Sequence, residues 1–225
     1  MCGRFTLKRP GRIRVSGLLE ELPPLPPRYN IAPSQEVLAV LERGTQREAT
    51  LVQWGLVPSW SNDAKGIINA RVETIEDKRS FSESFQRRRC LILADGFYEW
   101  ERIGEISQPY FFEMADSAPF AFAGVWDQWR HAGRSITSCA IITTTANELL
   151  AKIHQRMPVI LGAESYDLWL SEESRAPDLK EILVPFPAKE MKSHAVGYDV
   201  NDANVDHEGL LREVEPNIGV TYRLF

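Results

Sequence analysis

The second residue of the chain is a cysteine, and this position gives it chemistry that an internal cysteine lacks. If the initiator methionine is removed, Cys2 carries a free α-amine beside its thiol. An unperturbed α-amine has a pKa of about 7.7–8.0 and a free thiol one of about 8.5, so both supply some nucleophile near neutral pH. An amine with a vicinal thiol condenses with an aldehyde, first to an imine and then to a five-membered thiazolidine. Position alone favours the simpler interpretation, a small, semi-buried residue at a frayed terminus.

Two residues further along the chain are candidates for proton transfer. Glu99 stands between Tyr98 and Trp100 in an aromatic segment, where partial desolvation would raise the pKa of its carboxyl group toward the range useful for acid–base catalysis. The alternative is that strand alternation points Glu99 to solvent. His154 precedes Pro158 at an expected helix-to-loop junction, where a histidine can face a cleft or simply form a structural hydrogen bond.

A third group of candidates lies in an expected extended segment over residues 67–74. There Asn69, Arg71 and Glu73 would share one face, so an amide and a guanidinium could orient a substrate and bind a phosphate. An ordinary half-exposed strand fits the same pattern. Arg156 could likewise neutralise a helix C-terminus, and the run at 87–89 reads as a solvated basic face.

The elements that must position these residues are mostly short strands. Apolar runs and turn residues predict strands over 36–41 and 49–54, joined as a hairpin at Gly44, and further strands over 90–94, 97–100, 109–114, 120–126, 138–145 and 220–225, with 186–200 partly extended. Helices are expected over 12–22, 76–88, 148–154, 166–170 and 179–183. Because strands and helices do not alternate, we expect one α+β domain over residues 1–225, built on an antiparallel, barrel-like sheet with a few peripheral helices.

Composition limits the classes of function. The 225 residues are 44% hydrophobic and 25% charged, as in soluble globular proteins, and no apolar run approaches the ~20 residues of a membrane span. The first residues lack the apolar core of a secretory signal, so we expect a cytoplasmic protein without a membrane partner. Three cysteines and four scattered histidines give no disulfide or zinc-ligand spacing, and we expect no metal and no cofactor. The net charge of −5 means that any nucleic-acid binding must depend on a local arginine cluster.

Several segments, in a fixed order, resemble the SRAP (SOS response-associated peptidase) family. They are MCGRF at 1–5, YNIAP at 29–33, WGLVPSW at 54–60, INARVET at 68–74, RRCLILADGFYEW at 88–100, FAFAGVWD at 120–127, ITTTAN at 142–147 and HQRMPVIL at 154–161. A weaker match lies at 199–202, and we assign no role to the chain after about residue 170.

The resemblance implies an enzyme that crosslinks itself to abasic sites in single-stranded DNA and shields the lesion during the DNA damage response. On this basis the catalytic residues are the crosslinking Cys2, the orienting amide of Asn69, the acid–base Glu99 and the active-site His154. The implied DNA-binding residues are Arg4, Arg71 and Arg156 at phosphates, Pro33 and Trp60 against flanking bases, and Asn30 in the same region. Trp54 lies in the same segment and is the alternative to Trp60 as the residue that packs against a flanking base.

The chemistry of these groups is consistent with the implied activity. Glu99 and His154 could assist sugar ring opening and imine dehydration by proton transfer, and the thiol would close the ring intramolecularly. The family name also implies N-terminal autoprocessing. An N-terminal-nucleophile amidohydrolase of the glutamine amidotransferase type, or a binder of single strands with an inert Cys2, would also fit the N-terminal residues. We expect a monomer with single-stranded DNA as partner, associated with the nucleoid in a bacterium or nuclear in a eukaryote; replication proteins are further candidate partners.

Overall fold

The computed structural model describes residues 2–10, 24–44 and 46–216. Its strands are β1 Arg4–Leu7, β2 Arg28–Ile31, β3 Glu36–Arg43, β4 Gln46–Trp54, β5 Asn69–Arg71, β6 Arg89–Ala94, β7 Gly96–Ile103, β8 Ile106–Met114, β9 Phe120–His131, β10 Arg134–Thr145, β11 Arg156–Pro158, β12 Ile160–Leu161 and β13 Met191–Ala195. The helices are α1 Ser82–Arg87, α2 Tyr166–Leu170 and α3 Ala176–Ile182, with 3-10 helices over Val72–Thr74, Leu150–Lys152, Ala163–Ser165, Ala188–Glu190, Tyr198–Asn201 and Glu208–Leu211.

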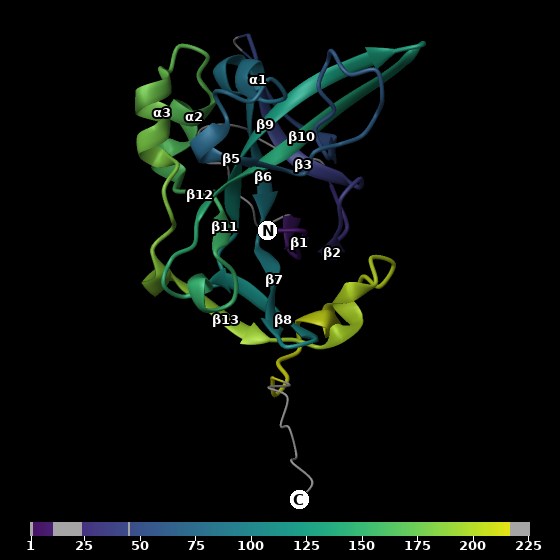
Figure 1. Cartoon of the computed structure of the whole chain (residues 1–225), viewed down its shortest axis with the longest axis vertical. Coiled ribbons are helices and arrows are strands. Elements are labelled where there is room, and N and C mark those ends of the chain that lie inside the picture. Colours follow the sequence, from purple (N-terminus) through teal and green to yellow (C-terminus); the bar gives the residue numbers. More distant parts are fainter. Residues whose placement is uncertain (1, 11–23, 45, 217–225) are drawn as a thin grey trace, which may run out of the picture.

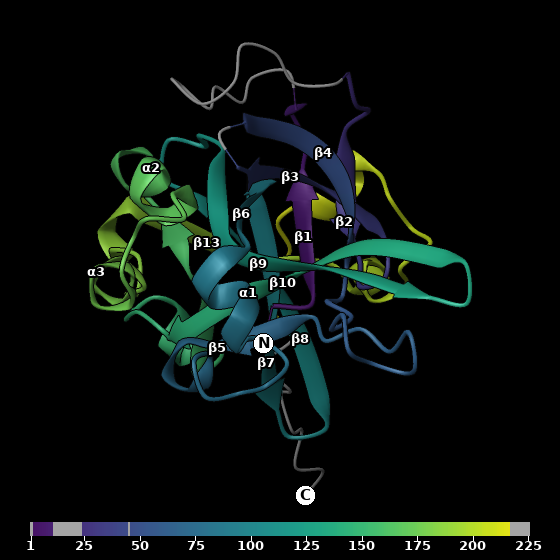
Figure 2. The same ribbon diagram turned by 90° about the horizontal axis from the view of Figure 1, so that it is seen from above.

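Five strands close into a barrel. The pairs β4–β3, β3–β6, β6–β9 and β9–β10 are antiparallel, and the parallel pair β10–β4 closes the ring. The long β9–β10 hairpin projects beyond the barrel (Figures 1 and 2). Each residue of β6 is buried, which is why its sequence is a continuous apolar run after Arg89. The predicted α+β barrel is confirmed, but the sheet is mixed because β4 and β5 both run parallel to β10.

A second sheet, in the order β13-β8-β7-β1-β2, packs on the barrel. Its inner face contributes Phe97, whose ring lies 5.2 Å from that of Phe112 and 6.0 Å from that of Phe122 on β9. Its outer face carries Tyr98 and Phe111, which pack with Val196, Val200 and Leu210 from the C-terminal part of the chain. Both faces of β7 are therefore covered.

Residues 196–216 are part of this fold. The Asp206 carboxylate accepts hydrogen bonds from the backbone N–H groups of Tyr29 and Asn30 at 2.6 and 3.1 Å, and Trp100 Nε1 donates to Asn201 Oδ1 at 2.8 Å. Residues 199–202, which match the family motif weakly, therefore lie on the outer face of the second sheet.

Several expected elements change length in the structure. The predicted hairpin at Gly44, the helix at 166–170 and the strands expected over 90–94, 97–100, 109–114, 120–126 and 138–145 are confirmed. Strands β8 and β10 begin earlier than expected, at Ile106 and Arg134. The helix expected over 76–88 is only α1, that over 148–154 is one 3-10 turn, and the segment over 67–74 leaves the extended conformation after Arg71. The predicted helix at 12–22 and strand at 220–225 lie outside the described residues.

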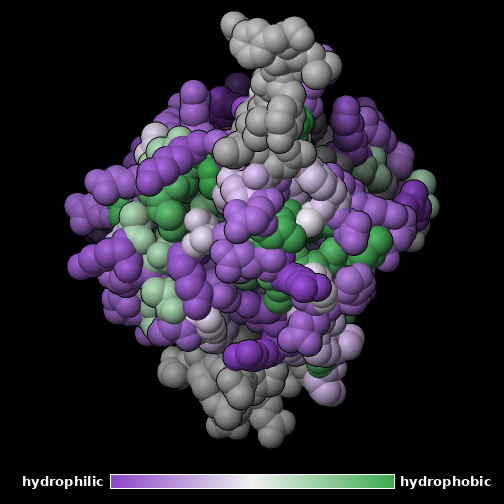
Figure 3. All heavy atoms as spheres, turned by 90° about the horizontal axis from the view of Figure 1, so that it is seen from below, coloured by the Kyte–Doolittle hydropathy of each residue, from purple (hydrophilic) through white to green (hydrophobic). Residues whose placement is uncertain are grey.

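The surface seen from below is mostly hydrophilic, with smaller groups of hydrophobic side chains between (Figure 3). Among the described residues, every helix is too short or too polar to cross a membrane.

Candidate active site

Cys2 lies in the hydrophobic core two residues before β1 begins, with none of its surface exposed. The pairing of β1 with β7, in which Arg4 faces Tyr98, brings the start of the chain beside the middle of β7. The Cys2 thiol lies 3.7 Å from the carbonyl oxygen of Arg4. Burial raises the pKa of this thiol, and the negative charge of Glu99 raises it further. At neutral pH the Cys2 side chain is therefore a protonated thiol.

Glu99 projects from β7 on the same face as Phe97, toward the barrel, and only 2% of its surface is exposed. Burial raises the pKa of its carboxyl group to about 7. The expectation that strand alternation exposes Glu99 is wrong, because residues 196–216 cover the Tyr98 face and the barrel covers the Glu99 face. A carboxyl group with a pKa near neutrality can both donate and accept a proton, which is the requirement for general acid–base catalysis.

Asn69 holds the backbone of Cys2. Its Nδ2 group donates a hydrogen bond of 3.0 Å to the Cys2 carbonyl oxygen. Asn69 is the first residue of β5 and pairs in parallel with Ile141 of β10, so a rigid barrel strand fixes the amide. This contact connects two residues that are 67 positions apart in the chain.

His154 and Arg156 reach the same end of β10 from its opposite edge. Strand β11 pairs Arg156 with Thr145, while β5 pairs Arg71 with Thr143. Nδ1 of His154 lies 3.0 Å from the backbone nitrogen of Arg156 and 3.1 Å from the Arg156 carbonyl oxygen, so the backbone of Arg156 fixes the position of the ring. Partial burial lowers the pKa of His154, so the neutral ring dominates at pH 7.

The three arginines implied as phosphate ligands differ in their surroundings. Arg71 is exposed, whereas Arg4 is half-buried and donates to the Gly3 carbonyl at 2.8 Å. Arg156 forms a bidentate ion pair with Glu73 and donates to the Thr143 carbonyl at 2.6 Å. Sequence reasoning placed Glu73 on the face of Asn69 and Arg71 but did not identify this pair.

The two tryptophans of the 54–60 segment have different positions. Trp54 ends β4, is fully buried, and donates from Nε1 to the Ile68 carbonyl at 3.0 Å. Trp60 is 47% exposed, and the Arg79 guanidinium lies 4.2 Å from its ring centroid. The Leu56–Ile67 bridge closes the base of the loop that carries Trp60. Of the two rings, only that of Trp60 is available to stack on a base.

Pro33 and Asn30 lie close in sequence but differ in their burial and in their contacts. Pro33 is half-buried in a turn with Ser34, which has a φ of 72°. The backbone N–H of Ser34 donates a hydrogen bond of 2.7 Å to the Trp54 carbonyl oxygen, which connects the turn to the end of β4. Asn30 is fully buried, and its Nδ2 group donates to the carbonyl oxygens of Val200, Asp202 and Val205 at 3.3, 2.9 and 2.8 Å. The Asn30 side chain therefore holds residues 200–205 against β2, and its contact with DNA stays a prediction.

Arg89 corrects the interpretation of residues 87–89 as a solvated face. Its side chain is buried, and its guanidinium donates to the carbonyl oxygens of Trp169, Phe85, Gln86 and Ser171. The guanidinium thus ties β6 to the ends of α1 and α2.

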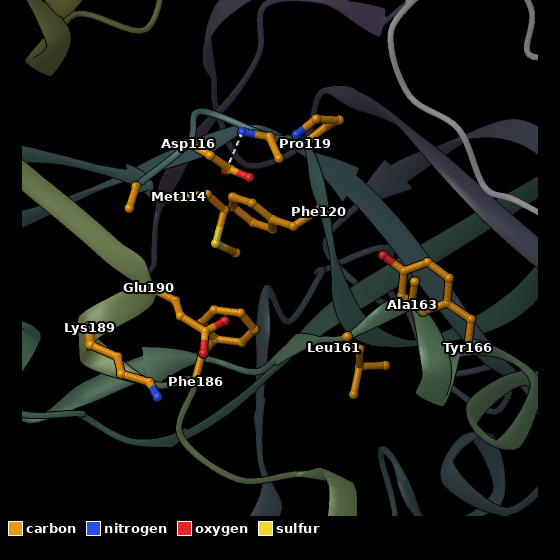
Figure 4. Close-up of a pocket in the computed structure, with 13 residues that line it drawn as sticks. Met114, Asp116, Pro119, Phe120, Leu161, Ala163, Tyr166, Phe186, Lys189 and Glu190 are labelled. Atoms are coloured by element: carbon orange, nitrogen blue, oxygen red, sulfur yellow. Dashed lines mark hydrogen bonds between the residues drawn. The ribbon is translucent and has the colours of Figure 1, made fainter.

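Within the described ranges, no three His, Cys, Asp or Glu side chains are grouped to hold a metal ion. A separate cavity of about 430 Å³ is bordered by the rings of Phe120, Tyr166 and Phe186, with Lys189 and Glu190 along one side (Figure 4). It contains none of the residues predicted for the site.

Comparisons with known proteins place these observations in a family. The chain matches the family described as SOS response associated peptidase (SRAP) over residues 1–203. It is 38% identical to the abasic site processing protein YoaM of Bacillus subtilis, covering 94% of this chain and 97% of that protein. It is 33% identical to the abasic site processing protein YedK of Escherichia coli, covering 93% and 97% of the two chains. A crystal structure from Bordetella bronchiseptica superposes with a TM-score of 0.75 at 29% identity, over 87% of this chain and all of the other. The chain belongs to the SRAP family.

Proposed function

We propose that this protein crosslinks itself to abasic sites in single-stranded DNA through the amine and thiol of a mature N-terminal Cys2. The observation that carries the proposal is the buried Glu99, with a pKa of about 7, close enough to Cys2 for its charge to raise the pKa of the thiol. A group able to exchange protons at neutral pH, close to the two nucleophiles of Cys2, supports the proposal.

The chemistry begins with the amine. Because the buried thiol is protonated, the amine is the stronger first nucleophile, and it adds to the C1′ aldehyde of the open-chain abasic sugar. The resulting carbinolamine loses water to give an imine, and Glu99 in its acid form can protonate the departing hydroxyl group. The Cys2 sulfur then adds to the imine carbon while its proton passes to the nitrogen, which closes the thiazolidine. The intramolecular geometry favours this last step through a high effective molarity.

The surrounding residues have supporting roles in the proposal. Asn69 fixes the Cys2 carbonyl and so orients the attacking nitrogen. His154, neutral at pH 7, can accept a proton during opening of the sugar ring. Arg4, Arg71 and Arg156 would contact phosphates, and the exposed ring of Trp60 would stack on a base next to the lesion, with Pro33 close by. We extend the proposal to hydrolysis of the Met1–Cys2 bond by the same acid–base groups.

The test compares the purified wild-type protein with Cys2→Ala on single-stranded DNA containing one abasic site. The wild type should form a heat-stable adduct whose intact mass equals the sum of the Met1-free protein and the DNA minus one water. Cys2→Ala should retain non-covalent binding and form no stable adduct, and Cys2→Ser at most a weaker imine or oxazolidine. Full adduct yield from Cys2→Ala, or from protein that retains Met1, would refute the mechanism. Glutamine hydrolysis without an adduct would instead favour an amidohydrolase.

A further inference from the structure

Arg156 is already bound to an anion within the protein. Its side chain leaves β11, crosses the end of β10 and reaches Glu73, in the 3-10 helix Val72–Thr74 that follows β5. Both terminal nitrogens of the guanidinium contact the Glu73 carboxylate, with 2.9 Å between Nη2 and Oε2. This bidentate geometry is the one with which a guanidinium also binds a phosphate.

Glu73 remains ionised at neutral pH. The hydrogen bonds from Arg156 lower the pKa of its carboxyl group, and the positive charges of Arg156 and Arg71 lower it further. The register places Arg71 opposite Thr143, whose carbonyl oxygen also accepts a hydrogen bond from Arg156. A carboxylate is therefore paired with one of the guanidinium groups that the proposed function assigns to phosphates, and it lies within electrostatic reach of a second.

The two partners differ in how firmly they are held. The Arg156 side chain is only 16% exposed and keeps its bond of 2.6 Å to the Thr143 carbonyl, so it stays in position without Glu73. The Glu73 side chain is 46% exposed and can turn into solvent. Such a partly exposed ion pair is worth little, so an incoming phosphate can displace the carboxylate at small cost.

We propose that Glu73 is a specificity-determining residue that competes with the DNA backbone for Arg156 and keeps non-covalent affinity for undamaged single strands low. The inference rests on the proposed function, because it takes Arg156 to be a phosphate ligand. Weak backbone binding lets the protein leave intact DNA, whereas an abasic site is retained by the covalent bond to Cys2. Specificity for the lesion then comes from chemistry rather than from affinity for the strand.

The test measures binding of an undamaged single-stranded oligonucleotide by fluorescence anisotropy over a range of salt concentrations. All proteins carry Cys2→Ala, so that crosslinking is excluded. Glu73→Gln should bind about two- to five-fold more tightly at low salt, the size expected for one partly exposed pair. The slope of log affinity against log salt should become steeper by at most about 0.7, the contribution of one phosphate contact on single strands.

Two controls separate this effect from a general change in charge. Glu83→Gln also removes one negative charge from a surface pair with an arginine, Arg88, in which Glu83 is 63% exposed; it should leave the affinity unchanged. In an Arg156→Gln background, Glu73→Gln should no longer tighten binding.

Unchanged or weaker binding by Glu73→Gln would overturn the inference. So would equal tightening by Glu83→Gln, or tightening that persists in the Arg156→Gln background. Because this assay contains no crosslinking step, its result is independent of the adduct assay. Tightening by Glu73→Gln supports the inference even if wild-type protein forms no adduct, and a normal adduct with no tightening overturns the inference alone.

Discussion

Replacing Glu99 by glutamine should slow crosslinking and at the same time stabilise the folded protein at alkaline pH. The carboxyl group is 2% exposed, and burial raises its pKa from 4.5 to about 7. Between these two values the folded state binds more protons than the unfolded state. Stability therefore falls as the pH rises through this window, and the loss is complete above the folded-state pKa.

The size of the effect follows from the two pKa values. Linkage gives a loss of about 2.5 kcal/mol between pH 5 and pH 8 for a group whose pKa rises by this amount on folding. Glutamine has nearly the same shape and no charge to bury, so Glu99→Gln should gain about 2.5 kcal/mol over wild type across the same interval. In a chain of this length this corresponds to roughly 5–10 °C in Tm.

The assay is urea unfolding followed by tryptophan fluorescence at pH 5 and pH 8, for wild type and Glu99→Gln in parallel. Other titrating groups are common to both proteins and cancel in the difference. The same two proteins are then compared for the rate of adduct formation, which should fall by about 10²- to 10⁴-fold if proton transfer by Glu99 is lost. A stability difference that is identical at the two pH values would refute the raised pKa. An unchanged crosslinking rate would remove Glu99 from the chemistry.

Two further predictions concern DNA binding by protein that carries Cys2→Ala. Arg71→Gln removes an exposed guanidinium and should weaken single-strand binding while reducing the slope of log affinity against log salt by about 0.7; an unchanged slope would exclude Arg71 from the phosphate contacts. Trp60→Ala removes a ring that is 47% exposed and should weaken binding about 5- to 150-fold, the range for one stacked base, with little change in Tm. Equal affinity of Trp60→Ala and the parent protein would show that this ring does not stack on DNA.

Local patterns in the sequence were sufficient to predict many of the elements. The β3–β4 hairpin, the apolar strand β6 and the short helix α2 were all predicted from runs of apolar residues and from turn residues such as Gly44. The family was also identified from sequence, because its motifs occur in a fixed order that covers most of the chain. These signals depend on residues that are near one another in the chain, so a single sequence contains them.

The positions of the site residues depended on contacts between distant segments. Alternation along β7 predicts that Glu99 and Tyr98 lie on opposite faces of the strand. It does not indicate that the Tyr98 face is covered by a segment about a hundred residues later in the chain. Trp54 is in the core because it ends β4, which pairs with β3 and β10, whereas Trp60 lies beyond the strand on the surface. The pairing with β10 could not be inferred from the local sequence. Nor does composition distinguish Arg89, buried among four carbonyl oxygens, from the solvated arginine at position 87.

The candidate nucleophile, the residue types of the site and the barrel-like fold class could all be inferred from the order of the residues. The folded chain was needed to show that Asn69 binds the backbone of Cys2, that Glu99 is buried, and that Glu73 and Arg156, 83 positions apart, form an ion pair. The physical reason is that burial, pKa and pairing depend on which surfaces the closed barrel and the second sheet bring together, and those surfaces come from strands far apart in the chain.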